Sequence, residues 1–278
     1  MPKLDRIPHF DPRSRGYGVR ELLPRRVERR QRLWALPSGA GYPIDQGQEG
    51  QCVGFGYTCE LAAEPIVIDV GQAFAPQLYR LAQAEDRKMG NYWDGGASML
   101  AGAKAAKNGG YIQSYRWAFG IDDVIDTLCA IGPVVLGINW YTDMYDTDHR
   151  GLVKVGGSLA GGHCICAVGY WPNHPDFGED VVVWMNSWGR SYGLNGVGFI
   201  RVPDLAGLLE DQGEAAIVVD VAPKPPPPPP VEQLFVAARR SVAFHRKGAH
   251  WWLPEARAWS KREDAIGAGL RPCRLCKP

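Results

Sequence analysis

The pattern of apolar and polar positions changes character near the middle of the chain. In the first half, residues 73–88 and 96–107 show helical spacing, and residues 122–131 predict a shorter helix. The apolar residues that carry the two longer patterns are Leu78, Leu81, Leu100 and Ala103. Residues 53–64 hold two glycines, which disfavour a helix, but small residues let a buried helix pack closely against its neighbours. We therefore expect a helical first half.

The second half has the short apolar runs of a β structure. Residues 133–138, 163–170, 180–185 and 198–202 predict strands, separated by turns of Gly, Asn and Pro. Within the longest run, alternation places His163, Ile165 and Ala167 on one face. Helices that precede strands predict an α+β protein of two halves with a cleft between them.

Both ends of the chain differ from its middle. Residues 17–33 predict an edge segment and a short helix, and residues 37–43 a loop. Residues 223–230 include six consecutive prolines, which extend about 19 Å as a stiff polyproline spacer. They match a ligand for a proline-reading domain in composition alone. We expect a basic segment over 1–40, a main domain over 41–222, this linker, and a small module over 231–278.

Composition is that of a globular protein, with 45% hydrophobic and 22% charged residues. Lys and Arg outnumber Asp and Glu in residues 1–36 and again in residues 231–278, so both ends are basic. Such ends suit anionic partners, although solvated surface arginines are the commoner explanation. No run has the length of a signal peptide core or a membrane span, and the cysteines lie scattered in apolar surroundings. These features favour the cytoplasm, or a particle assembled inside a cell.

Three separated segments carry candidate chemistry. Cys52 follows Gln46 by six positions in a glycine-rich turn, His163 begins an apolar strand, and Asn186 ends another. A thiol reacts as thiolate, which needs an imidazole partner and a third group to orient that ring. Alone, each would more often be a buried cysteine, a core histidine or a turn asparagine. Together they predict a Cys-His-Asn site.

These segments resemble the papain-like cysteine peptidases. The family reads D-Q-G-x-C-G-S-C-W-A-F, then G-G-H-A-x-x-x-V-G-Y, then N-S-W-G-x-x-W-G-x-x-G-Y. Residues 45–55, 161–170 and 186–199 match these blocks in order, and the resemblance covers roughly residues 20–222. It implies a two-lobed fold, with a helical lobe and a β-barrel-like lobe flanking the active-site cleft, and hydrolysis of peptide bonds through a covalent acyl-enzyme without a cofactor.

The resemblance also assigns roles. Cys52 is the nucleophile at a helix N-terminus, His163 its proton partner, Asn186 the residue that orients the ring, and Gln46 the oxyanion donor. In the family, Trp188 covers the Asn-His hydrogen bond. The residues implied to contact substrate are Gly50, Gly95, Gly96, Gly162 and Trp188, although ordinary turns explain the glycines equally well.

The chain departs from the family pattern at three positions. Val53 replaces a tryptophan beside the nucleophile, Tyr192 replaces a later tryptophan, and Glu49 brings a negative charge to the cleft entrance, which disfavours acidic substrates. About forty residues precede the active-site turn, so we expect a chain without the long inhibitory propeptide of secreted relatives.

The end of the chain resembles a degenerate form of the zinc module of Ada-type DNA repair proteins. Cys273 and Cys276 keep a C-x-x-C pair, and His245 and His250 would complete a Cys₂His₂ structural zinc site. The alternative is a metal-free remnant held by tryptophans. Without further cysteines, methyl transfer is not expected, but a basic, Trp-rich module could bind nucleic acid or a protein partner.

Two kinds of function compete for the main domain. The first is a cysteine peptidase that acts on peptide or protein substrates. The second is a catalytically silent scaffold or binding protein, which has no physical need to keep Gln46, Cys52, His163 and Asn186.

Overall fold

The computed structural model describes residues 2–36 and 41–219, together with the stretches 235–238, 243–246, 256–259 and 262–272. The chain divides into two compact units, residues 1–221 and 222–278, and each is described by itself. Within the described residues, no helix combines the length and apolar character that a membrane span requires.

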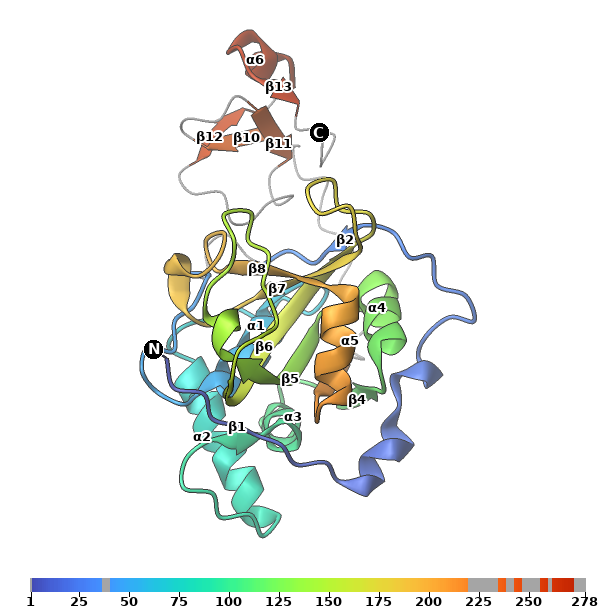
Figure 1. The fold of residues 1–278 in the computed structure, drawn as a ribbon, viewed down its shortest axis with the longest axis vertical. Coiled ribbons are helices and arrows are strands. Elements are labelled where there is room, and N and C mark those ends of the chain that lie inside the picture. The colour runs from blue at the N-terminus through green and yellow to red at the C-terminus, as the bar shows by residue number, and fades with distance from the viewer. Residues whose placement is uncertain are drawn as a thin grey trace. The chain divides into compact units, whose positions relative to one another are not determined.

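Three helices form the first lobe of the larger unit: α1 (Cys52–Ala62), α2 (Ala75–Lys88) and α3 (Met99–Asn108). They lie within a few residues of the predicted ranges (Figure 1). Every residue of α1 is buried, which explains how a glycine-containing segment becomes a helix. The helical spacing was misleading at Leu81, whose side chain is 44% exposed because it lies on the outer face of α2.

Close packing of α1 against α3 depends on Gly102. A Cβ at this position would lie 2.8 Å from Val53 Cγ1 and closer still to the ring of Tyr57. We expect Gly102→Ala to lower the free energy of unfolding by ~1–3 kcal/mol, because the rigid ring cannot move away. Gly207→Ala is the matched control, since a Cβ at Gly207 would meet no atom within 4 Å apart from its chain neighbours and the backbone of its own helix. Denaturant midpoints measure both, and equal midpoints would contradict the packing argument.

The second lobe is built on a seven-stranded sheet with the order β4-β9-β5-β6-β7-β8, and β2 pairs with β6. Its strands are β2 (Arg32–Leu33), β4 (Ser114–Ala118), β5 (Val134–Tyr141), β6 (Leu159–Trp171), β7 (Val181–Met185), β8 (Val197–Arg201) and β9 (Glu214–Val219). The predicted strands are present, but the sequence did not indicate β4, β9 or the helix α5 (Val202–Glu210). α4 (Ile121–Ala130) is one residue from its predicted range.

Alternation along the strands sorts side chains between two cores. Ile165 and Ala167 of β6 join the core that includes α4 and α5, whereas Cys164 joins the core of α1 and α3. β5 and β9 divide their residues in the same way. Both faces of the central strands are therefore buried, with α1–α3 on one face and α4 and α5 on the other (Figure 1).

The basic N-terminal region forms two 3-10 turns, Pro12–Tyr17 and Val19–Glu21. Within residues 17–33, where an edge segment and a short helix were expected, the structure has the second of these turns and the short strand β2. Its arginines find partners within the fold. Arg29 binds Asp126 at 2.7 Å and Asp122 at 2.8 Å, and Arg20 pairs with Asp123 of the same helix, α4. The positive charges of Arg20 and Arg29 therefore have a structural role, because their ion pairs attach the N-terminal region to the acidic face of α4.

The smaller unit contains a four-stranded sheet with the order β12-β10-β11-β13 and the short helix α6 (Arg262–Gly267). Its strands are β10 (Phe235–Ala238), β11 (Ala243–Arg246), β12 (Ala256–Trp259) and β13 (Arg271–Pro272). His245 lies in β11 opposite Val236. The other expected zinc ligands, His250, Cys273 and Cys276, and the polyproline linker lie outside the described residues.

Candidate active site

Cys52 is the first residue of α1, directly after the turn that the sequence singled out. Gln51 occupies the N-cap position and makes no side-chain cap hydrogen bond, so its side chain satisfies none of the first backbone N–H groups of the helix. A helix N-terminus favours negative charge, which is the property a thiolate needs. The thiol is nevertheless fully buried.

His163 on β6 and Asn186 after β7 form a hydrogen-bonded pair. The distance from His163 Nε2 to Asn186 Oδ1 is 2.9 Å, and both side chains are buried. The amide oxygen must accept, so Nε2 carries the proton and Nδ1 keeps a free lone pair. Nδ1 is buried and has no hydrogen-bond partner among the described residues, so it is not bonded to the Cys52 thiol. The ring therefore has the tautomer that can accept a proton.

Trp188 holds this imidazole from one side. Its ring stacks on His163 with centroids 4.8 Å apart and an interplanar angle of 25°. Trp140 meets the same ring edge-to-face, also at 4.8 Å. Both tryptophans are buried, so they exclude water from the Asn186–His163 hydrogen bond and strengthen it.

Gln46 points its amide group at main-chain carbonyls. Nε2 donates to the carbonyl oxygen of Lys3 at 3.0 Å and to that of Glu49 at 2.8 Å. Oε1 accepts from the hydroxyl of Ser187 at 2.7 Å, which fixes the orientation of the amide. Nothing in the sequence indicated this role of Ser187, although the residue lies within the Asn-Ser-Trp-Gly block that matches the family pattern.

A peptide segment of the chain itself occupies the cleft. We call residues 3–7 the N-terminal segment; it contains β1 (Arg6–Ile7; Figure 1). This strand pairs in parallel with β3 (Ala97–Ser98). The carbonyl oxygen of Asp5 accepts from the N–H of Ala97 at 3.2 Å. The backbone N–H of Asp5 lies against the Cys52 thiol. An extended main chain therefore crosses the cysteine while its Lys3 carbonyl meets Gln46.

The glycines that the sequence associated with substrate all face this segment. A Cβ on Gly50 would overlap the carboxylate of Asp5, and one on Gly96 would overlap the backbone of Asp5. A Cβ on Gly162 would overlap the backbone of Arg6, and one on Gly95 would lie 3.6 Å from the Asp5 carboxylate. Gly95 and Gly96 also have positive φ angles of 89° and 73°, which few other residues adopt. These positions allow a peptide backbone to lie flush against the cleft wall.

The five residues of the N-terminal segment cover the thiol. Sequence reasoning missed this because nothing in Lys3–Ile7 marks it as a cleft occupant: the contacts join residues that are distant along the chain.

Burial sets the charge state of the site in this closed form. It raises the pKa of Cys52 to about 11, although nearby backbone N–H groups, that of Asp5 foremost, oppose the rise. Burial also lowers the pKa of His163 to about 4, and the hydrogen bond that His163 donates to Asn186 opposes this shift. At neutral pH both groups are uncharged. Exposure to water would remove the main cause of both shifts and move the two pKa values toward each other.

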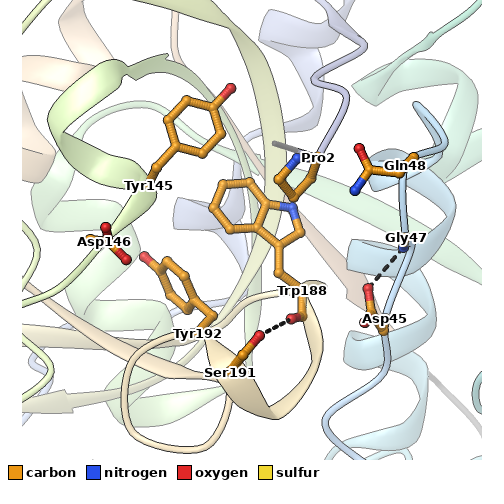
Figure 2. Close-up of a pocket in the computed structure, with 9 residues that line it drawn as sticks. All are labelled: Pro2, Asp45, Gly47, Gln48, Tyr145, Asp146, Trp188, Ser191 and Tyr192. Carbon is orange, nitrogen blue, oxygen red and sulfur yellow. Dashed lines mark hydrogen bonds between the residues drawn. The ribbon is translucent and has the colours of Figure 1, made fainter.

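An open pocket of about 510 Å³ lies between Trp188 and the turn that contains Gly47 and Gln48 (Figure 2). Trp188, Tyr145 and Tyr192 form its aromatic wall, and Pro2 closes one side. Asp45 and Asp146 give it a negative rim. The chain therefore has room for further peptide residues beyond Lys3, at the end of the cleft that the N-terminal segment leaves free.

Comparison with solved structures identifies the architecture. Xylellain, a cysteine protease from Xylella fastidiosa, aligns with a TM-score of 0.55 and 17% identity over 78% of this chain and 96% of its own. The fold is papain-like. Digestive procathepsin L 3 from the Tenebrio molitor larval midgut aligns with a TM-score of 0.50 and 16% identity, over 78% of this chain and 75% of its own.

The proCathepsin B S9 from Trypanosoma congolense gives a TM-score of 0.50 and 13% identity, over 78% of this chain and 82% of its own. No family model and no curated protein matches the sequence. The likeness is therefore one of fold: a papain-like helical lobe and sheet lobe, with Cys52 from the first lobe and His163 and Asn186 from the second.

Proposed function

We propose that this chain is a cysteine peptidase that hydrolyses peptide bonds in peptide or protein substrates. The observation that carries the proposal is the extended main chain over Cys52, whose Lys3 carbonyl accepts from Gln46 Nε2. A cleft that seats a peptide in this way, beside an oriented imidazole, has the parts needed for attack on a carbonyl carbon.

The reaction follows from the roles of these groups. With substrate in place of the N-terminal segment, His163 Nδ1 accepts the proton of the Cys52 thiol, and Asn186 holds the ring through Nε2. The sulfur attacks the carbonyl carbon, and the resulting oxyanion accepts from Gln46 Nε2. His163 then returns the proton to the departing amine and leaves a thioester. Attack by water, with its proton taken by His163, releases the acid and restores the thiol.

Labelling and hydrolysis test the proposal. Cys52→Ala should remove both the cleavage of fluorogenic peptides and the mass added by an epoxide that alkylates papain-type thiols. Cys129→Ala is the matched control: its side chain is the more accessible of the two, yet it lies at the far end of α4. Labelling that persists in Cys52→Ala would contradict the proposal.

The burial of Cys52, and the absence of a hydrogen bond to His163, favour a second candidate, a silent papain-like scaffold. The two candidates differ in what happens when the N-terminal segment is loosened. A peptidase gains reactivity at Cys52, whereas a scaffold stays unreactive. The Arg6→Ala experiment below therefore decides between them.

A further inference from the structure

Four cysteines lie where α1 packs against β6. Cys52 and Cys59 belong to the helix, and Cys164 and Cys166 belong to the strand. All four are buried free thiols, and only Cys52 takes part in the proposed reaction. The question is therefore what the other three thiols can do, since burial alone requires no more of them than a small apolar side chain.

Gly56 brings the helix close to the strand. A Cβ at this position would lie 2.6 Å from Cys164 Sγ and 3.3 Å from Val135 Cγ1 on the neighbouring strand β5. Cys59 lies three residues beyond Gly56, nearly one turn, and therefore on the same face of α1. Cys166 lies two residues beyond Cys164, and therefore on the same face of β6. The close approach at Gly56 thus extends to Cys59 and Cys166.

The side chains of Cys59 and Cys166 are in contact, and their thiols form a hydrogen bond. The other hydrogen bond of Cys166 Sγ is a long one, 3.9 Å to the carbonyl oxygen of Ala167. Cys164 differs from this pair, because its Sγ lies 3.6 Å from Met99 Sδ, a thioether that cannot form a disulfide. A disulfide needs Cα atoms within about 7 Å of each other and Cβ atoms that face one another. Two thiols in contact across a helix and a strand suit that requirement.

A bond between these two sulfurs would connect the two lobes. It would join the helix that begins at Cys52 to the strand that contains His163. It would also close a long loop, residues 59–166, and a cross-link over a long loop removes much of the conformational freedom of the unfolded chain. The expected consequence is a more stable fold in which α1 is tied to β6.

We propose that Cys59 and Cys166 are a disulfide-forming pair, and that oxidation by a low-molecular-weight disulfide locks α1 to β6. The pair stays reduced where glutathione keeps thiols reduced, and it is oxidised where the chain meets an oxidising medium. Neither thiol belongs to the catalytic set, so the proposal does not depend on the proposed function.

The reaction is two successive thiol–disulfide exchanges. The thiolate of one cysteine attacks oxidised glutathione, whose S–S bond breaks, so that a mixed disulfide forms and one glutathione thiolate leaves. The thiolate of the other cysteine attacks the protein sulfur of the mixed disulfide and releases the second glutathione. Two protein thiols are oxidised to one disulfide, the oxidant is reduced to two thiols, and these take up the two protons.

Burial determines when this exchange takes place. It raises the pKa of Cys166 well above that of a free thiol, so little thiolate is present once α1 has packed on β6. The oxidant also has no path to two buried sulfurs. The bond therefore forms while the chain folds, and in the folded chain it is protected from reductants.

The experiment refolds the full chain with Cys52→Ala from denaturant in a buffer of oxidised and reduced glutathione. The remaining thiols are alkylated, and mass spectrometry of a non-reducing digest should show the peptide of Cys59 linked to that of Cys166. The midpoint of thermal unfolding should exceed that of the same chain refolded in dithiothreitol by at least about 5 °C. Comparing the two forms of one chain cancels any effect of a substitution on basal stability.

Three further variants complete the test. Cys59→Ala and Cys166→Ala should each remove both the link and the rise in midpoint, and either one is sufficient if the other does not fold. Cys164→Ala is the matched control, since this thiol lies on the same face of β6 but contacts Met99. It should keep both the link and the rise.

The proposal is overturned if both thiols are alkylated after oxidative refolding, or if either is linked to a different cysteine. A correct link that leaves the midpoint unchanged would refute the lock. Because Cys52 is absent from the chain that is measured, none of these results depends on whether the wild-type chain cleaves peptides.

Discussion

Arg6→Ala should raise the rate at which Cys52 reacts with iodoacetamide at pH 7 by about 10- to 300-fold. Removing one partner of a buried ion pair typically costs ~3–5 kcal/mol, and each 1.36 kcal/mol is a factor of ten in a population. Part of this free energy is lost from the binding of the N-terminal segment over Cys52, since Arg6 is the buried side chain that holds the segment in place through its ion pair with Glu214. Protonation of Glu214, whose pKa burial already raises to about 7, offsets the rest.

The pH dependence of the same reaction distinguishes exposure of the Cys52 thiol from a general destabilisation of the fold. In the wild-type chain the pKa of Cys52 is about 11, so about one thiol in 10⁴ is ionised at pH 7. Its labelling rate should therefore rise about tenfold per pH unit up to that value. In Arg6→Ala the profile should level off at a lower pH, because water reaches the thiol and His163 can take its proton.

Lys3→Ala is the control for this experiment. The side chain of Lys3 lies in the same segment but is 61% exposed, and its pair with Asp5 at 3.0 Å is a surface one. Its labelling rate should stay within about twofold of wild type. If Arg6→Ala and Lys3→Ala behave alike, the anchoring role of Arg6 is wrong. If neither is labelled at any pH at which it stays folded, the silent scaffold is the better account.

Gln46→Ala should lower kcat by about 10²- to 10³-fold and change KM little. Removing one oxyanion donor has an effect of this size because the donor acts most strongly on the charge that develops in the transition state. The measurement is steady-state hydrolysis in the Arg6→Ala background, where the cleft is free. Gln77→Ala is the matched control, since that amide is exposed on α2 and donates to the carbonyl oxygen of Ala73, just before the helix.

Ser187 allows a finer test of the same group. Its hydroxyl holds Gln46 Oε1 at 2.7 Å, so it is a positioning residue that would not touch substrate. Ser187→Ala should lower kcat by about 3- to 10-fold, the loss of one hydrogen bond, and the effect should vanish when Gln46 is already alanine. Additive losses in the double variant would show that Ser187 acts elsewhere.

The closed form gives a physical account of how a thiol can be kept unreactive by a short segment. The N-terminal segment covers Cys52, Trp140 and Trp188 pack on His163, and burial moves the pKa values of the two groups apart. Proton transfer from sulfur to nitrogen is then unfavourable, although the imidazole has the right tautomer. Restraint of this kind needs no distortion of the site, so we expect removal of the segment to bring the two pKa values closer together.

Much of the helical and strand pattern could be predicted because it follows from local chemistry. The spacing in residues 73–88 and the alternation in residues 163–170 are properties of contiguous sequence, and both segments fold as expected. β9 escaped prediction since its two faces enter different cores, which gives a continuous apolar run without clear periodicity. Leu81 misled for a different reason, because helical spacing alone does not distinguish the buried face of a helix from its outer face.

By itself the sequence determined the identity and order of the candidate groups, Gln46, Cys52, His163 and Asn186, together with the glycines that line the cleft. Only the tertiary structure decided what fills that cleft. The ion pair between Arg6 and Glu214 joins residues 208 positions apart, and neither residue belongs to a local pattern. A contact of this kind depends on how two lobes and a terminal segment pack together, and periodicity along the chain carries no information about that packing.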